Sequence, residues 1–154
     1  MRIRPYEETD AEAIVTLFYE TVHKVNAQDY TPEQLRVWAP VVPDAAAWHE
    51  RMAKRHTLVA EEKGKIFAFA ELDNSGYLDM FYCHHDAQRQ GIGSWLYSKV
   101  ETAALESGLT RMTTDASISA RPFFEHQGFS LVKENRIERG GVKLANFTME
   151  KELA

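Results

Sequence analysis

The most diagnostic segment of the sequence is Gln88-Arg89-Gln90-Gly91-Ile92-Gly93, a turn between a strand-like run and an amphipathic helix. The apolar run before it covers residues 78–83, and the helical pattern after it covers residues 93–107. A glycine-rich turn in this position exposes backbone N–H groups at a helix N-terminus, which makes an anion site without charged side chains. The segment therefore predicts a phosphate-binding turn.

Two common phosphate motifs do not fit this turn. A Walker loop requires a glycine, four residues and then Gly-Lys-Ser/Thr, and a dinucleotide fingerprint requires three glycines with an acidic residue about 20 positions later. Neither pattern is present around residues 88–93. A helix start that holds no ligand is the alternative interpretation, because short glycine patterns recur by chance.

Composition and charge limit the class of protein. With 154 residues, 44% hydrophobic and 27% charged, the sequence predicts one compact domain over residues 1–154. The net charge of -5 and the pI of about 5.7 argue against a nucleic-acid partner, because binding phosphates requires clustered Lys and Arg. A cationic small molecule or peptide is the more natural partner.

Cysteine and histidine usage predicts neither a disulfide nor a metal site. Cys83 is the only cysteine, so an intrachain disulfide and a cysteine-based zinc cluster are excluded. His84, His85 and His126 do not form ligand spacing with an acidic cluster. The first residues lack the apolar core of a signal peptide, and no apolar run reaches the length of a membrane helix. We therefore expect a soluble, cytoplasmic protein with no membrane partner.

The hydrophobic periodicity predicts a mixed α+β fold. The expected elements, in chain order, are a strand over residues 3–6, a helix to about residue 26, a short helix from residue 32, a helix over 45–54, strands over 57–61, 66–72 and 77–83, a helix over 93–107, a strand over 109–114, a helix over 120–126 and two strands joined around 139–141. Helix caps are expected at Thr9, Thr31 and Asp44.

Two segments and this element order resemble one family. The Gln-x-x-Gly-x-Gly pattern of residues 88–93 resembles the pyrophosphate signature Arg/Gln-x-x-Gly-x-Gly/Ala of the GNAT superfamily, the acyl-coenzyme A-dependent N-acyltransferases. Ser117-x-x-Ala120-x-x-x-Phe124-x-x-x-Gly128-Phe129 is similar to that family's Asn-x-x-Ala-x-x-x-Tyr-x-x-x-Gly-Phe segment. The resemblance covers nearly the whole chain and implies a central mixed, mostly antiparallel sheet of about seven strands flanked by helices.

The resemblance also implies acetyl-coenzyme A as co-substrate, held where the strand before the turn separates from the fifth strand. Carried over residue by residue, the strand contacts are Phe81, Tyr82 and Cys83. The pyrophosphate contacts are Gln88, Arg89, Gln90, Gly91, Ile92, Gly93 and Ser94. The alternatives are ordinary strand packing for Phe81 and Tyr82 and a solvated surface charge for Arg89.

Attack of an amine on a thioester needs a base, and Asp79 is the first candidate. It lies in an apolar strand, on the expected face of Tyr77 and Phe81, where a raised pKa would suit proton abstraction. The alternative is that Asp79 points to solvent or pairs with an arginine. Glu71 on the preceding strand and His23 at the end of the first helix are further candidates.

The proton donor cannot be carried over from the family. Phe124 stands where the resemblance places a Tyr that acts as the general acid, and Ser117 stands where it places Asn. A phenyl ring has no proton to donate, so Tyr82, Tyr77 and solvent remain open as donors.

The acceptor is expected to bind near the first helices. That region carries His23, Asn26, Tyr30, Trp38 and Trp48, which suit an amine bearing a ring or a cation. We expect Tyr30, Trp38 and Glu71 to contact it. The alternative is that the two tryptophans are core residues of short helices.

The sequence thus predicts an N-acetyltransferase that moves an acetyl group from acetyl-coenzyme A to a primary amine of a small molecule or peptide, by direct attack in a ternary complex. A backbone N–H of the separated strand would stabilise the oxyanion. A covalent route through Cys83 is disfavoured because no His-Asp partner is placed by sequence. The alternative is a non-catalytic acyl-coenzyme A-binding sensor or interaction module. The sequence leaves the oligomeric state open between a monomer and a homodimer that pairs through edge strands.

Overall fold

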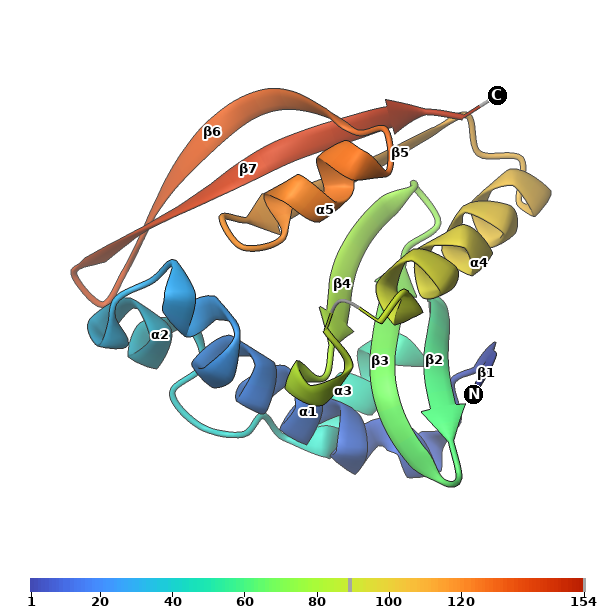
Figure 1. Ribbon diagram of the computed structural model, residues 1–154, viewed down its shortest axis with the longest axis horizontal. Helices are drawn as coiled ribbons and strands as arrows, with labels where there is room; N and C mark the ends of the chain where they lie inside the picture. The colour runs from blue at the N-terminus through green and yellow to red at the C-terminus, as the bar shows by residue number, and fades with distance from the viewer. Residues whose placement is uncertain (89, 154) are drawn as a thin grey trace.

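One mixed sheet runs through the molecule (Figure 1). A computed structural model describes residues 1–88 and 90–153, so Arg89 lies outside the described residues. Within them, seven strands form the sheet in the order β1-β2-β3-β4-β5-β7-β6. The strands are β1 (Arg2–Pro5), β2 (His56–Glu62), β3 (Lys65–Leu72), β4 (Tyr77–Cys83), β5 (Arg111–Ser117), β6 (Ser130–Arg139) and β7 (Val142–Glu152). The predicted α+β class and the mostly antiparallel sheet are confirmed.

Helices cover both faces of the sheet, as Figure 1 shows. The helices are α1 (Ala11–Lys24), α2 (Pro32–Trp38), α3 (Ala45–Met52), α4 (Ile92–Glu106) and α5 (Arg121–His126), with short 3₁₀ turns η1 (Glu8–Asp10), η2 (Asn26–Gln28) and η3 (His85–Ala87). One hydrophobic cluster joins α4 and α5 to the sheet, and a second joins α1, α2 and α3 to its other face. None of the helices within the described residues is both long and apolar enough to cross a bilayer.

The two halves of the sheet are joined by very little pairing. β4 and β5 are parallel and pair only at Tyr77↔Thr113 and Leu78↔Thr114. Beyond these positions β4 pairs with β3 alone, while β5 pairs with β7 as far as Ser117↔Asn146. The strands therefore separate toward their C-terminal ends, and we call this opening the β4–β5 split.

Two of the three predicted helix caps are confirmed. At α2, the Thr31 hydroxyl accepts from Gln34 N–H at 3.2 Å and the Gln34 side chain accepts from Thr31 N–H at 2.8 Å. Asp44 accepts from Ala46 N–H at 3.2 Å at the start of α3. The cap at Thr9 is wrong, because the chain enters α1 through η1 and Asp10, not Thr9, accepts a backbone N–H, from Glu7 at 2.8 Å.

The predicted end of the fifth strand is also wrong. The sequence predicts residues 109–114, whereas β5 spans Arg111–Ser117. Pairing with β7 carries β5 through its polar second half, where Ala116 is buried but Asp115 is exposed. This half of β5 has the polar composition of a loop, because the side chains on one of its faces border a cavity rather than the core.

Candidate active site

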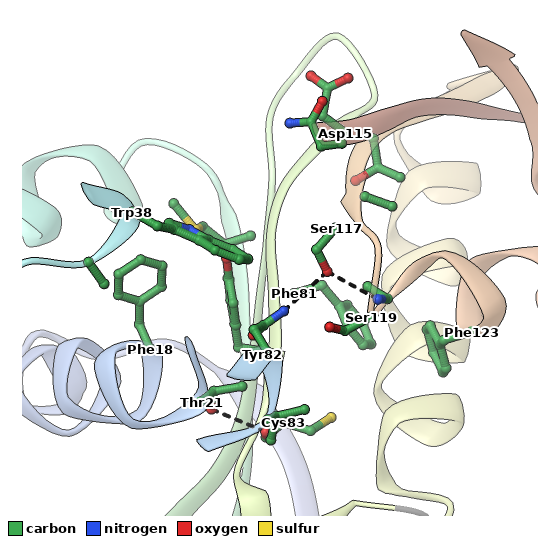
Figure 2. Close-up of a pocket in the computed structure, with 18 of the residues that line it drawn as sticks. Phe18, Thr21, Trp38, Phe81, Tyr82, Cys83, Asp115, Ser117, Ser119 and Phe123 are labelled. Atoms are coloured by element: carbon green, nitrogen blue, oxygen red, sulfur yellow. Dashed lines mark hydrogen bonds between the residues drawn. The ribbon is translucent and has the colours of Figure 1, made fainter. Parts of the chain in front are cut away.

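A cavity of about 820 Å³ occupies the β4–β5 split. Figure 2 shows its walls: Phe18, Trp38 and Tyr82 lie on one side, and Ser117, Ser119 and Phe123 lie on the other. The volume falls in the range of small-molecule and cofactor pockets. The cavity reaches from the start of α4 to the point where the two strands separate.

The N-terminus of α4 faces this cavity through a glycine cap. Gly91 is the N-cap with φ of 79°, and the first backbone bond of the helix runs from Trp95 N–H to the Gly91 carbonyl at 3.0 Å. The N–H groups of Ile92, Gly93 and Ser94 precede that bond and have no partner within the helix. A Cβ at Gly91 would meet no protein atom within 4 Å. Free N–H groups at a helix N-terminus, with open space at the cap, are an arrangement that suits an anion.

Glutamine side chains hold the turn in place. Gln88 donates from Nε2 to the Cys83 carbonyl at 2.7 Å, and Gln90 donates from Nε2 to the Asp86 carbonyl at 2.8 Å. Packing also favours glycine at position 93, because a Cβ there would lie 3.2 Å from the Phe123 ring. The residues predicted to wrap a phosphate therefore also build the turn that presents the N–H groups.

The backbone of β4 presents polar groups to the split. His84 N–H donates to the Phe67 carbonyl of β3 at 2.7 Å, so alternation directs the backbone groups of Tyr82 toward β3 and those of Phe81 and Cys83 away from it. The Cys83 carbonyl accepts from Thr21 at 3.2 Å as well as from Gln88. Phe81 N–H, Phe81 C=O and Cys83 N–H face the side on which β5 has moved away.

Comparisons with known proteins agree with this geometry. A sequence model described as an acetyltransferase (GNAT) domain matches residues 26–153. An Escherichia coli (strain K12) protein described as the uncharacterized N-acetyltransferase YafP is 32% identical over 149 residues, which cover 97% of this chain and 94% of that protein. The chain belongs to the GNAT acetyltransferase family.

Solved structures place this GNAT chain among acetyltransferases. A GCN5-related N-acetyltransferase from Rhodopseudomonas palustris, also described as a class-II aminotransferase, has a TM-score of 0.92 at 33% identity, covering 99% of this chain and 95% of that one. A putative acetyltransferase from Salmonella typhimurium, solved with its cofactor acetyl-CoA, has a TM-score of 0.77 at 21% identity, covering 100% and 94%. The second likeness supports the fold alone.

A bulge in β4 changes the face on which Asp79 of this GNAT enzyme lies. The register passes from Glu71↔Met80 to Leu72↔Leu78, so Asp79 is one extra residue without a partner in β3. Phe81 consequently packs in the cluster under α4 and α5, whereas Met80 packs on the α1 side. The prediction that Asp79 shares a face with Phe81 is therefore wrong.

Asp79 lines the cavity and belongs to a four-residue charge network. Arg55 Nη1 donates to Asp79 Oδ2 at 2.7 Å and to Glu71 Oε1 at 2.8 Å. Arg51 donates to both oxygens of Glu71, at 2.6 and 3.0 Å. The network joins two cations to two carboxylates, and among the described contacts it engages only one oxygen of Asp79.

Glu71 and His23 do not lie where sequence reasoning expects them. Glu71 is 0% exposed, is held by two arginines and is absent from the cavity wall, so its predicted substrate contact is corrected. His23 Nε2 bonds the Ala39 carbonyl at 2.7 Å, and His23 is likewise absent from the wall. The end of α1 directs this ring to the α2–α3 loop, away from the split.

Tyr30 and Trp38 do line the cavity, as predicted for acceptor contacts. The Tyr30 hydroxyl donates to the Ala145 carbonyl at 2.7 Å, and its ring lies edge-on to Trp38 with centroids 5.1 Å apart. Tyr82 faces the same space, and burial raises its pKa, so its phenol stays protonated. Both hydroxyl-bearing rings remain neutral near physiological pH.

The second motif plays a structural part. Phe124 is 2% exposed and packs edge-on against Phe81 with ring centroids 5.7 Å apart. The Ser117 hydroxyl accepts from Ala120 N–H at 3.0 Å and from Asn26 Nδ2 at 3.3 Å. Neither residue offers an acidic proton to a leaving thiolate.

Sequence reasoning missed Asp115, which lines the cavity just beyond the last β4–β5 pair. Its carboxylate accepts from the Tyr77 hydroxyl at 2.9 Å and from the Thr148 hydroxyl at 2.6 Å. The signal was an acidic residue between Thr114 and Ala116, which becomes visible only when β5 is extended past residue 114.

Cys83 carries a thiol that remains protonated. Burial raises its pKa to about 12, so little thiolate forms near neutral pH. The structure thus supports the expectation that no acyl group passes through this sulfur.

One group of possible metal ligands occurs within the described residues, where the sequence predicts none: Glu20, His84 and His85, whose ligand atoms lie within 4.8 Å of one another. His84 Nδ1 accepts the Asp86 N–H at 3.1 Å, which leaves Nε2 as the protonated nitrogen of the neutral ring. A protonated nitrogen does not bind a metal. In this tautomer His84 is therefore not a metal ligand.

Proposed function

We propose that this GNAT enzyme transfers an acetyl group from acetyl-coenzyme A to a primary amine by direct attack in a ternary complex. The observation that carries the proposal is one cavity that is lined both by Gly91, Gly93 and Ser94 at the start of α4 and by Asp79 of β4. Acetyl-coenzyme A is the proposed co-substrate because two structures of the same fold, from Salmonella typhimurium and Thermoplasma acidophilum, were solved with acetyl-CoA and with coenzyme A.

The pyrophosphate would bind the free N–H groups of Ile92, Gly93 and Ser94, with Arg89 as a further charged contact. The pantetheine arm would bond the outward backbone groups of Phe81 and Cys83. Because the backbone groups of Tyr82 face β3, we assign Tyr82 to the acceptor half of the cavity. The space beside the Gly91 cap fits a phosphate that approaches the backbone closely.

The chemistry divides between backbone and carboxylate. The neutral amine attacks the thioester carbon, and the outward N–H group of Phe81 stabilises the oxyanion. The Phe81 carbonyl and the Cys83 N–H remain for the pantetheine arm. Asp79 accepts the proton that the nitrogen loses, directly or through water, as the C–N bond forms. The C–S bond then breaks, and the leaving thiolate takes a proton from water because Phe124 supplies none.

A second candidate is a non-catalytic acyl-coenzyme A-binding module. The observation that favours it is the buried phenyl ring of Phe124 where the family pattern has an acidic Tyr. Such a module would bind the cofactor through the same turn and release no thiol.

Thiol release from acetyl-coenzyme A across a panel of primary amines separates the two candidates. We expect amine-dependent release, and we expect Asp79→Asn to lower turnover by roughly a hundredfold or more without changing coenzyme A affinity. Glu12→Gln, which removes an exposed carboxylate of α1, is the control and should keep wild-type turnover. Tight binding of acetyl-coenzyme A with no release for any amine would instead support the module.

A further inference from the structure

Among the residues that the structure describes, the charged ones in the cavity wall are Asp79, Asp115 and Arg139. Both carboxylates already have partners in the protein: one oxygen of Asp79 bonds Arg55, and Asp115 bonds the hydroxyls of Tyr77 and Thr148. Arg139 differs from them, because none of the ion pairs among the described residues involves it. The wall therefore offers a bound ligand one guanidinium that no described carboxylate neutralises.

The position of Arg139 is fixed by the hairpin that carries it. Arg139 is the last residue of β6 and pairs with Val142 of β7. The adjoining turn packs on α2, since a Cβ at Gly140 would lie 3.7 Å from Val37 Cγ1. Trp38, the next residue of α2, stands in the cavity wall, so the hairpin brings the guanidinium to the aromatic side of the cavity.

The positive charge of Arg139 acts on Tyr82, which lines the aromatic side of the cavity. Burial raises the pKa of Tyr82, the negative charge of Asp79 adds to the rise, and the positive charge of Arg139 opposes it. An anionic group of a ligand that lies beside Arg139 would gain a charge-assisted bond.

Aromatic rings form the rest of this side. Phe18 lies 4.9 Å from Trp48 and 5.1 Å from Tyr82 between ring centroids. The α2–α3 loop adds Val41, which lines the cavity and is 67% exposed. An apolar side chain left in water at a cavity wall gains by contact with an apolar ligand.

Building on the proposed function, we infer that the acceptor is an amine with an apolar or aromatic body and a carboxylate, and that Arg139 binds the carboxylate. This narrows the expectation of a ring-bearing or cationic amine, because the carboxylates that would hold a cation are already engaged. A guanidinium can hold a carboxylate through two parallel N–H···O bonds, so Arg139 acts as a specificity residue without touching the reacting atoms.

Matched acceptor pairs test this inference: para-aminomethylbenzoate with benzylamine, and phenylalanine with phenethylamine. We expect the carboxylated member of at least one pair to have the lower KM by roughly ten- to a hundredfold, the effect of one bond to a charged group. Arg139→Gln should erase the preference while the KM for acetyl-coenzyme A stays unchanged. Arg36→Gln, which removes an exposed arginine of α2, is the matched control and should keep the preference.

Calorimetric binding of the same acceptors to the protein loaded with coenzyme A separates this inference from the proposed transfer. Binding that depends on the carboxylate and on Arg139, without thiol release, would uphold the inference and contradict the transfer. Thiol release with equal KM for both members of every pair, a preference that survives Arg139→Gln, or no binding of any carboxylated acceptor would overturn the inference.

Discussion

Asp79 reaches Arg55 because β4 carries one residue more than β3 at the bulge. The extra residue turns its carboxylate to the α1 side of the sheet and leaves Phe81 on the other side. A single inserted position thus separates the proposed base from the apolar ring beside it. The same network holds Glu71, whose burial without its arginines would be costly.

The thiol of Cys83 gives a test at the residue scale. Because burial raises its pKa to about 12, we expect alkylation of the folded protein to stay slow at about pH 8, where a free cysteine is partly thiolate. Labelling followed by mass spectrometry measures the rate, with the unfolded chain as the fast control. Cys83→Ala should also retain acetyl transfer. Rapid labelling of the folded protein, together with loss of acetyl transfer in Cys83→Ala, would instead support a covalent mechanism through Cys83.

At the scale of elements, α4 is the component that we propose binds the pyrophosphate of the cofactor. Its N-terminus is capped by Gly91 at φ of 79°, and its C-terminal end is followed by Gly108 at φ of 80°. A Cβ at either glycine would meet no protein atom within 4 Å. The two positions are therefore matched in backbone strain and in space, and differ in that only Gly91 lies at the proposed phosphate site.

Gly91→Val and Gly108→Val make use of this match. We expect each to lower the free energy of unfolding by about 1–2 kcal/mol, because a side chain at positive φ is strained. Gly91→Val alone should abolish measurable coenzyme A binding in calorimetry, while circular dichroism shows that both variants remain folded. Equal affinities of the two variants for coenzyme A would contradict the placement of the pyrophosphate at the start of α4.

The elements set by local rules could be predicted from the sequence. The cap at Thr31, the helix start after Gly91 and the hairpin before Val142 depend on residues a few positions apart, so their signals are local. The bulge at Asp79 depends on its pairing with β3, and the bond from Thr148 to Asp115 joins strands far apart in the chain. Such long-range pairing leaves no pattern in a single sequence, which is why the face of Asp79 and the position of Asp115 were missed. An arginine partner for Asp79 was predicted only as the alternative to its role as a base.

At the scale of the molecule, the β4–β5 split lies between two groups of elements. In the proposed reaction α4 and the end of β4 bind the cofactor, whereas α1, α2 and the β6–β7 hairpin surround the acceptor. Both sides share one sheet in which β1 and β7 come from opposite ends of the sequence.

We propose that residues 1–154 form a single domain, since a shared sheet couples the two sides. Thermal unfolding followed by circular dichroism and by tryptophan fluorescence should therefore give one coincident transition. Added coenzyme A should raise its midpoint, because a ligand that binds the native state stabilises it. Two transitions, with only one of them shifted by coenzyme A, would show that the halves unfold independently.

A crystal structure of the protein with coenzyme A tests the placement of the cofactor most directly. We predict that the pyrophosphate accepts from the N–H groups of Ile92, Gly93 and Ser94, that the pantetheine arm lies along Phe81 and Cys83, and that the sulfur ends beside Asp79. Coenzyme A bound outside the β4–β5 split, or with its sulfur directed away from Asp79, would contradict the proposed transfer at this site.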